Sequence, residues 1–309
     1  MSGRTKRIIY QFVDLVLWLA AIVGVVLMLR FGRPDKKFGV GEIVVCVMLV
    51  LAVFLRIPVL IHELGHLIFG WLAGFKAAAV SLGLVRISRE GIRFNGYSNV
   101  AGATEMFPTS GKYMRVRFLA HTLGGGVFNL LAGGTLLTLY LCLPYHEALL
   151  FCGMLSLFSL YEGFRAFFPA QLRAGKTDGA IALGLLRRSS EEEVTLCILK
   201  AQGILFRGKF SDVPRELLFD TPVVREDTPE FFALYFLRMQ YLLYHGEESE
   251  ARKILIRLEE LGEYLSETER GELMRYRSYF YGRFTAKKEP LSGINDLEEK
   301  LQKSSERTE

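Results

Sequence analysis

The sequence predicts an all-α polytopic membrane protein with about four transmembrane helices, a small membrane-associated β region and a C-terminal helical domain. Two observations lead to this fold class. Half of the 309 residues are hydrophobic (50%), and the apolar residues gather in the first half of the chain in long runs. The second half, from about residue 187, is charged and has the periodicity of amphipathic helices. This composition excludes an ordinary soluble enzyme.

The apolar runs are long enough to cross a bilayer, which requires about 20 residues. Basic residues precede the first run and no small-residue cleavage site follows it, so we expect a retained transmembrane helix rather than a signal peptide. Asp14 inside this run is interpreted as a helix-end residue that reaches the membrane interface. Pro58 is expected to kink the second run. The four runs cover residues 8–29, 43–74, 116–143 and 148–168.

Positively charged connections predict which ends of the spans face the cytosol. The N-terminus, the connection at 75–117 and everything after Pro169 are rich in Lys and Arg, whereas the turn at 144–147 has none. The cationic link at 30–41 runs against this scheme, but four spans still fit best with that link outside. We therefore expect both termini in the cytosol, in what the compact size suggests is a bacterial cytoplasmic membrane. Flanking cations explain the net charge of +5, so no nucleic-acid partner is expected.

Between the second and third runs the sequence favours short strands, at 80–87, 92–97 and 100–106, separated by turn residues. We expect a small β-hairpin or three-stranded sheet at the membrane surface. Its edge could accept an extended peptide as an added strand. A plain connecting loop is the alternative.

The sequence His62-Glu63-Leu64-Gly65-His66 lies near the end of the second apolar run. On a helix, His62 and His66 lie one turn apart on one face, which is the spacing that two imidazoles need to share a tetrahedral zinc ion. The carboxylate of Glu63 can then reach a water at the open position of the metal. Because ionisable residues are costly inside a membrane span, this cluster indicates a catalytic zinc site.

Two other polar residues stand out in apolar surroundings. Asn129 follows a run of glycines at 124–126, and its amide could bind a substrate backbone or a developing oxyanion, or simply bond to a neighbouring helix. Asp178 opens a short apolar helix, where it could serve as the N-terminal cap. The charge asymmetry puts Asp178 on the same side of the membrane as the histidine motif. His121 is interpreted as a structural histidine and not as a ligand.

These motifs resemble those of the site-2 proteases, a family of intramembrane zinc metalloproteases, over roughly residues 43–186. His62-Glu63-x-x-His66 matches the first motif of that family. Gly125-Gly126-x-x-Asn129 is similar to its Gly-Pro-x-x-Asn element, and Asp178-Gly179 to its Asp-Gly motif. One departure is Ala166, which stands where the family has the asparagine of an Asn-x-x-Pro element.

The resemblance implies that His62, His66 and Asp178 hold Zn²⁺. It also implies that Glu63 is the general base, and that Asn129 helps to hold the oxyanion. The expected reaction is the hydrolysis of peptide bonds in membrane-spanning or membrane-associated proteins, with the lipid bilayer as the medium. The alternative is a non-proteolytic membrane scaffold with a silent or structural metal site. A zinc transporter is a third reading, but the sequence has no second cluster of ligands.

We expect three parts: a transmembrane metalloprotease domain at 1–188, a cytosolic helical domain at 189–286, and a charged, disordered tail at 287–309. The cytosolic domain would dock a cytosolic protein partner, regulate the protease or only stabilise it.

Within the cytosolic domain, amphipathic runs at 231–244 and 249–261 predict an antiparallel helix pair similar to a tetratricopeptide unit. One such pair cannot bury both of its faces. Flanking helices at 191–206 and 266–281 are therefore expected to stack on it.

Overall fold

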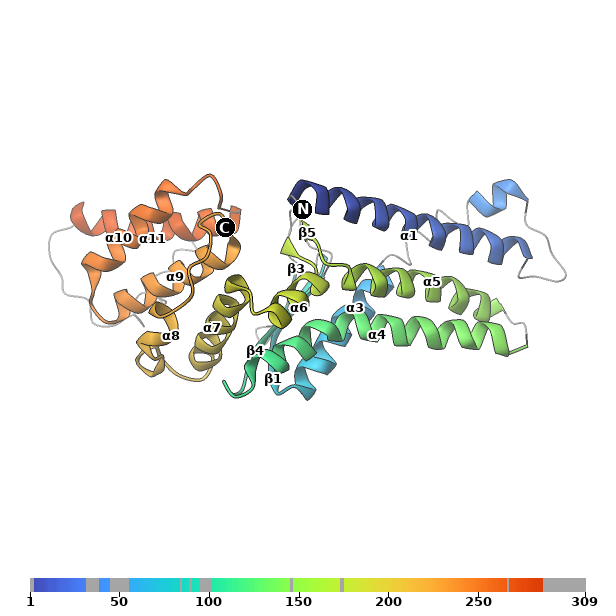
Figure 1. Cartoon of the computed structure of the whole chain (residues 1–309), viewed down its shortest axis with the longest axis horizontal. Coiled ribbons are helices and arrows are strands. Elements are labelled where there is room, and N and C mark those ends of the chain that lie inside the picture. Colours follow the sequence, from blue (N-terminus) through green and yellow to red (C-terminus); the bar gives the residue numbers. More distant parts are fainter. Residues whose placement is uncertain are drawn as a thin grey trace. The chain divides into compact units, whose positions relative to one another are not determined.

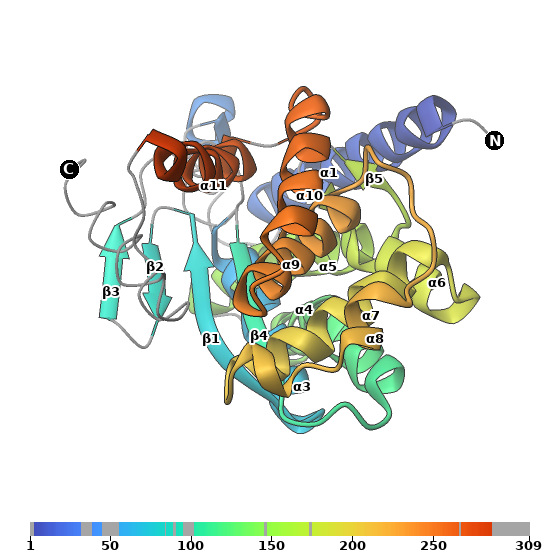
Figure 2. The ribbon, with the colours of Figure 1, turned by 90° about the vertical axis from the view of Figure 1, so that its left-hand side faces the viewer.

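A computed structural model describes residues 3–31, 39–44, 56–83, 85–88, 91–94, 102–144, 147–172, 175–265 and 267–285. The chain divides into two compact units, Met1–Arg187 and Arg188–Glu309. The protein is mostly helical, with a small antiparallel sheet in the first unit (Figures 1 and 2). The expected disordered tail at 287–309 lies outside the described residues.

Among the residues that the structure describes, three helices of the first unit are long and apolar enough to cross a membrane. They are α1 (Gly3–Phe31), α4 (Met114–Cys142) and α5 (Glu147–Phe167), and they correspond to the first, third and fourth predicted spans. The histidine motif lies on α3 (Arg56–Leu72). Residues 45–55, which would complete a fourth span, lie outside the described residues. The four-span count therefore stays a prediction.

The packing of α1 explains why a helix this apolar belongs in a membrane. Val25 and Leu29 are buried against α5, where they meet Phe158 and its neighbours. The opposite side is open: Phe12 is 65% exposed and Val23 is 54% exposed. A lipid environment explains this exposed apolar face without a further protein partner. Figure 1 shows α1 running beside α5, and α5 beside α4.

A polar network joins α1 to α5 inside the first unit. Asp14 accepts a hydrogen bond from the Tyr161 hydroxyl at 2.8 Å and forms an ion pair with Arg165 at 3.3 Å. Arg165 also donates to Glu162 at 2.7 Å and to the Tyr10 hydroxyl at 3.0 Å. Glu162 and Arg165 are three positions apart on α5, a spacing at which opposite charges pair on a helix. These contacts with α5 neutralise Asp14 and remove the cost of an unpaired charge. Its expected reach to the membrane interface stays a prediction.

The sheet has four strands in the order β3-β2-β1-β4, all antiparallel. Figure 2 shows β4 beside the helices of the unit and β3 at the far edge. The strands are β1 (Phe75–Leu82), β2 (Val85–Ser88), β3 (Gly91–Phe94) and β4 (Gly102–Pro108).

The prediction of a hairpin or three-stranded sheet is corrected by this topology. A single strand at 80–87 is wrong, because Gly83 adopts a left-handed φ of +58° and turns the chain so that Leu82 pairs with Val85. The predicted turn within 95–101 lies outside the described residues.

The second unit contains helices at all four predicted ranges, the amphipathic pair and the two helices expected to flank it. These are α7 (Ser190–Leu205), α9 (Pro229–Tyr244), α10 (Glu248–Glu260) and α11 (Glu267–Thr285). Two of them begin at residues with a capping side chain: Ser189 accepts from the Glu192 N–H, and Thr228 from the Phe231 N–H. The short helix α8 (Arg215–Phe219) was not predicted.

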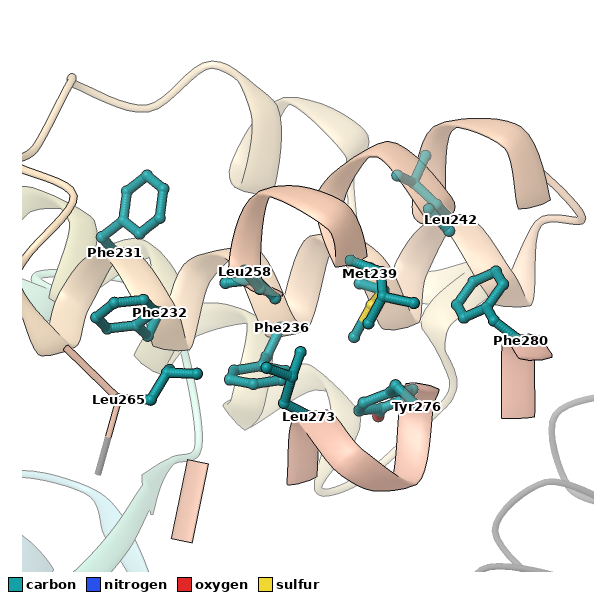
Figure 3. Packing of buried hydrophobic residues seen from close by; sticks show 12 residues of the cluster. Phe231, Phe232, Phe236, Met239, Leu242, Leu258, Leu265, Leu273, Tyr276 and Phe280 are labelled. Atoms are coloured by element: carbon teal, nitrogen blue, oxygen red, sulfur yellow. The ribbon is translucent and has the colours of Figure 1, made fainter. Parts of the chain in front are cut away.

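Helix α9 is the centre of this unit because it is buried on two faces. On one face, Phe236 and Met239 pack with Leu258 of α10 and Tyr276 of α11, as Figure 3 shows. The opposite face of α9 packs against α7 and α8, where Val194 is fully buried. The flanking helices therefore cover the central pair, as expected. The likeness to a tetratricopeptide unit stays a prediction.

Candidate metal centre

Three side chains from two helices of the first unit converge on one point. His62 and His66 lie one turn apart on α3, and Asp178 is the first residue of α6 (Asp178–Arg187). The two Nε2 atoms are 3.0 Å apart, and Oδ2 of Asp178 lies 3.0 Å from Nε2 of His62 and 3.5 Å from that of His66. Tetrahedral ligands with bonds of 2.0–2.1 Å lie roughly 3.3 Å from one another. The three atoms are thus spaced like ligands of a single ion.

The glycines of α4 create the space in front of the two imidazoles. A Cβ on Gly125 would lie 2.6 Å from Nε2 of both His62 and His66. A Cβ on Gly65 of α3 would collide with the carbonyl oxygen of Gly124. The two helices can therefore approach this closely only where both have glycine. Glycine at position 125 thus keeps the space beside the two nitrogen atoms clear of a side chain.

The residues on either side of Asp178 place its side chain beside the two imidazoles. The cap of α6 is Thr177, whose Oγ1 accepts from the Ala180 N–H at 3.3 Å, so capping does not require the Asp178 side chain. A Cβ on Gly179 would collide with the carbonyl oxygen of Phe167. Glycine there lets the start of α6 abut the end of α5, which brings Asp178 beside α3.

The electrostatics of Asp178 suit a metal ligand. Burial by itself raises the pKa of its carboxyl, but hydrogen bonds and charges from His62 and His66 outweigh burial and hold that pKa well below its usual range. The side chain is therefore an anion at neutral pH. An ionised carboxylate is the form that binds a divalent cation.

His66 is oriented by the backbone of α4. Its Nδ1–H donates to the carbonyl oxygen of His121 at 2.8 Å, which leaves Nε2 to face Asp178. His121 donates from its own Nδ1 to the carbonyl oxygen of His66 at 3.1 Å and stacks on Phe75. The structural role predicted for His121 agrees with these contacts.

Glu63 lies against the N-terminal end of strand β4. Its side chain is 5% exposed, and Oε2 accepts a hydrogen bond from the Thr104 hydroxyl at 2.5 Å. A Cβ on Gly102 would lie 2.6 Å from Oε1. Sequence reasoning missed both β4 residues, because no local pattern indicates which strand end will meet a helix in space.

A cavity of about 230 Å³ opens beside these groups. His62, Glu63 and Asp178 line it together with Arg165 and Tyr10 of the polar network. Two of the three predicted ligands, His62 and Asp178, therefore border the same space as the predicted base, Glu63. The arrangement can hold a divalent cation next to a carboxylate, beside a cavity large enough for water.

Asn129 lies behind His62 and not on the cavity wall. It is 0% exposed, it is not among the residues that line the cavity, and its Nδ2 lies 3.3 Å from Nδ1 of His62. The predicted role in holding an oxyanion stays a prediction. The sequence did not predict this contact between Asn129 and His62.

Comparison of the chain with protein-family models, with curated proteins and with solved structures found no match. The assignment of a function therefore depends on the residues and geometry described above.

Proposed function

We propose that this chain is an intramembrane zinc metalloprotease that cuts membrane-spanning or membrane-associated proteins, as its resemblance to the site-2 proteases implies. One observation carries the proposal. The side chains of His62, His66 and Asp178 meet with the spacing of three zinc ligands, and Glu63 borders the same cavity. Three protein ligands would leave a fourth position of the ion for water, as in catalytic zinc sites.

The residues have distinct roles in the proposed reaction. Nε2 of His62, Nε2 of His66 and Oδ2 of Asp178 would hold the ion, which when bound supplies a Lewis acid for the attacking water and the scissile carbonyl. Glu63 takes the proton of the attacking water on its carboxylate and returns it to the leaving amine. Thr104 holds this carboxylate in place through its hydrogen bond to Oε2.

The substrate must reach the site as an extended chain, because a helix hides its carbonyl groups in internal hydrogen bonds. Strand β4 is an edge of the sheet among the described residues, and its Gly102 and Thr104 touch Glu63. We propose that an unwound substrate segment adds to this edge as a fifth strand. This would bring its backbone past the Glu63 carboxylate.

The membrane setting of the proposal includes four spans, with α3 as part of the second, and both termini in the cytosol of a bacterium. The sheet would lie at the membrane surface, where its outermost strand β3 exposes Ile92 (67%) and Phe94 (83%). The second unit would be a tetratricopeptide-like cytosolic domain that docks a protein partner.

The experiment that tests the function compares wild-type protein with Glu63→Gln. The variant keeps the shape of the side chain and all three ligands, so we expect it to retain one zinc per chain and to lose cleavage. Mass spectrometry of membrane peptides from cells that express each protein should show new termini within apolar segments only for the wild type. Glu105→Gln is the matched control. Glu105 follows Thr104 on β4, and its carboxylate pairs with Arg86.

Two results would contradict the proposal. Cleavage that survives in Glu63→Gln would exclude Glu63 as the general base. Equal sets of termini in both samples, with a cytosolic protein still recruited, would favour the non-proteolytic scaffold.

A further inference from the structure

The two candidate zinc histidines are supported in different ways. A histidine that binds a metal through Nε2 carries its proton on Nδ1, and that N–H needs an acceptor. His66 has one in the carbonyl oxygen of His121. For His62, the polar group found at Nδ1 is the side-chain amide of Asn129, which is placed with its Nδ2 at 3.3 Å.

The Asn129 amide is an unusual group to find in this position. Asn129 is 0% exposed on α4, and its Oδ1 is buried with no hydrogen-bond partner among the described residues. A half-satisfied buried amide costs free energy, so an apolar residue would serve the packing of α3 against α4 better. Its presence therefore needs a reason other than helix packing.

The orientation of the amide supplies that reason. The oxygen and nitrogen of an asparagine amide exchange places by a half-turn of the side-chain end. With the oxygen toward His62, the Nδ1–H of His62 donates to Oδ1 of Asn129. The lone pair of His62 then lies on Nε2, the atom that faces His66 and Asp178.

We infer that Asn129 is a positioning residue, whose amide oxygen accepts the Nδ1 proton of His62 and so presents Nε2 of His62 to a divalent metal ion. The inference rests on the proposed function, because it assigns the metal to these ligands. It gives Asn129 a role that acts through His62, whereas direct contact with substrate would require a place on the cavity wall.

The test measures metal affinity in the full-length protein in detergent, by competition for Zn²⁺ with a chromophoric chelator and by the visible spectrum of added Co²⁺. Asn129→Leu removes the acceptor and should weaken affinity by about 10- to 100-fold, the usual effect of losing such a partner. Its thermal unfolding without metal should occur at the same or a higher temperature. Asn129→Asp keeps an acceptor oxygen and should bind within a few-fold of wild type.

The control is Thr138→Val on the same helix, whose hydroxyl donates to the Gly134 carbonyl of its own helix. It should leave metal affinity unchanged. Wild-type affinity in Asn129→Leu would overturn the inference and leave the proposed function standing. If Asn129→Leu unfolded at a lower temperature without metal and kept its metal affinity, Asn129 would only bond one helix to another. A wild-type protein that binds neither ion would overturn the inference and the proposed function together.

Discussion

Gly125 gives the sharpest test of the metal centre, because one methyl group can close the site without changing a ligand. In Gly125→Ala the added Cβ would lie 2.6 Å from Nε2 of both His62 and His66, whereas ordinary contacts begin at 3.4 Å. Each imidazole would have to retreat by about 0.8 Å, and metal sites tolerate deviations of about 0.2 Å. We expect zinc affinity to fall by at least 10- to 100-fold, or about 1.4 to 2.8 kcal/mol.

The assay is the zinc content of the purified protein, followed by titration with a chelator of known affinity. The matched control is Gly134→Ala on the same helix, where an added Cβ meets nothing within 4 Å. The control should bind zinc like the wild type and gain about 0.5–1 kcal/mol of stability, since alanine is the better helix former. If Gly125→Ala held one zinc per chain at wild-type affinity, the ion could not lie between these imidazoles.

The remaining predictions concern the second unit. Leu255 is 1% exposed in the core around α9, so Leu255→Ala should lower the free energy of unfolding of that unit by about 2–5 kcal/mol, measured by hydrogen exchange. Ile256 is 43% exposed, so Ile256→Ala should lower it far less. Equal effects of the two substitutions would contradict the packing. Burial raises the pKa of Glu272 above its usual 4.5, although Arg275 opposes this. Its protonated form therefore stabilises the fold below about pH 4.5, and this contribution is lost as pH rises through the raised value. Glu272→Gln should raise the unfolding temperature at pH 8 and leave it unchanged at pH 4. A lower unfolding temperature at pH 8 would contradict the upward direction of the Glu272 pKa shift.

The helices could be predicted from the sequence because their signals are local. Apolar runs of the required length predicted α1, α4 and α5, and amphipathic periodicity predicted α9 and α10. The flanking helices α7 and α11 were predicted because that pair needs neighbours to cover its faces. The sheet was predicted less well. The turn at Gly83 depends on one glycine in a left-handed conformation within a run of strand-forming residues. The alternation of apolar and polar residues, which predicts strands, does not show where such a turn interrupts them.

The polar network shows the limit of reading charges one at a time. Glu162 and Arg165 are three positions apart on one helix, so their pairing could be predicted. Asp14 pairs with the same arginine from another helix, and only the packing of α1 on α5 shows this contact.

The sequence by itself determined the chemistry available to this protein: two imidazoles one helical turn apart with a carboxylate between them, in an apolar helix. Helical geometry fixes that arrangement wherever the helix goes. Only the tertiary structure decided which distant groups meet it. The approach of α4 through Gly125, the placement of Asp178 through Gly179, and the amide of Asn129 behind His62 all arise from contacts between helices that lie far apart in the chain. Such contacts depend on how whole helix surfaces fit together, which no local pattern of residues encodes.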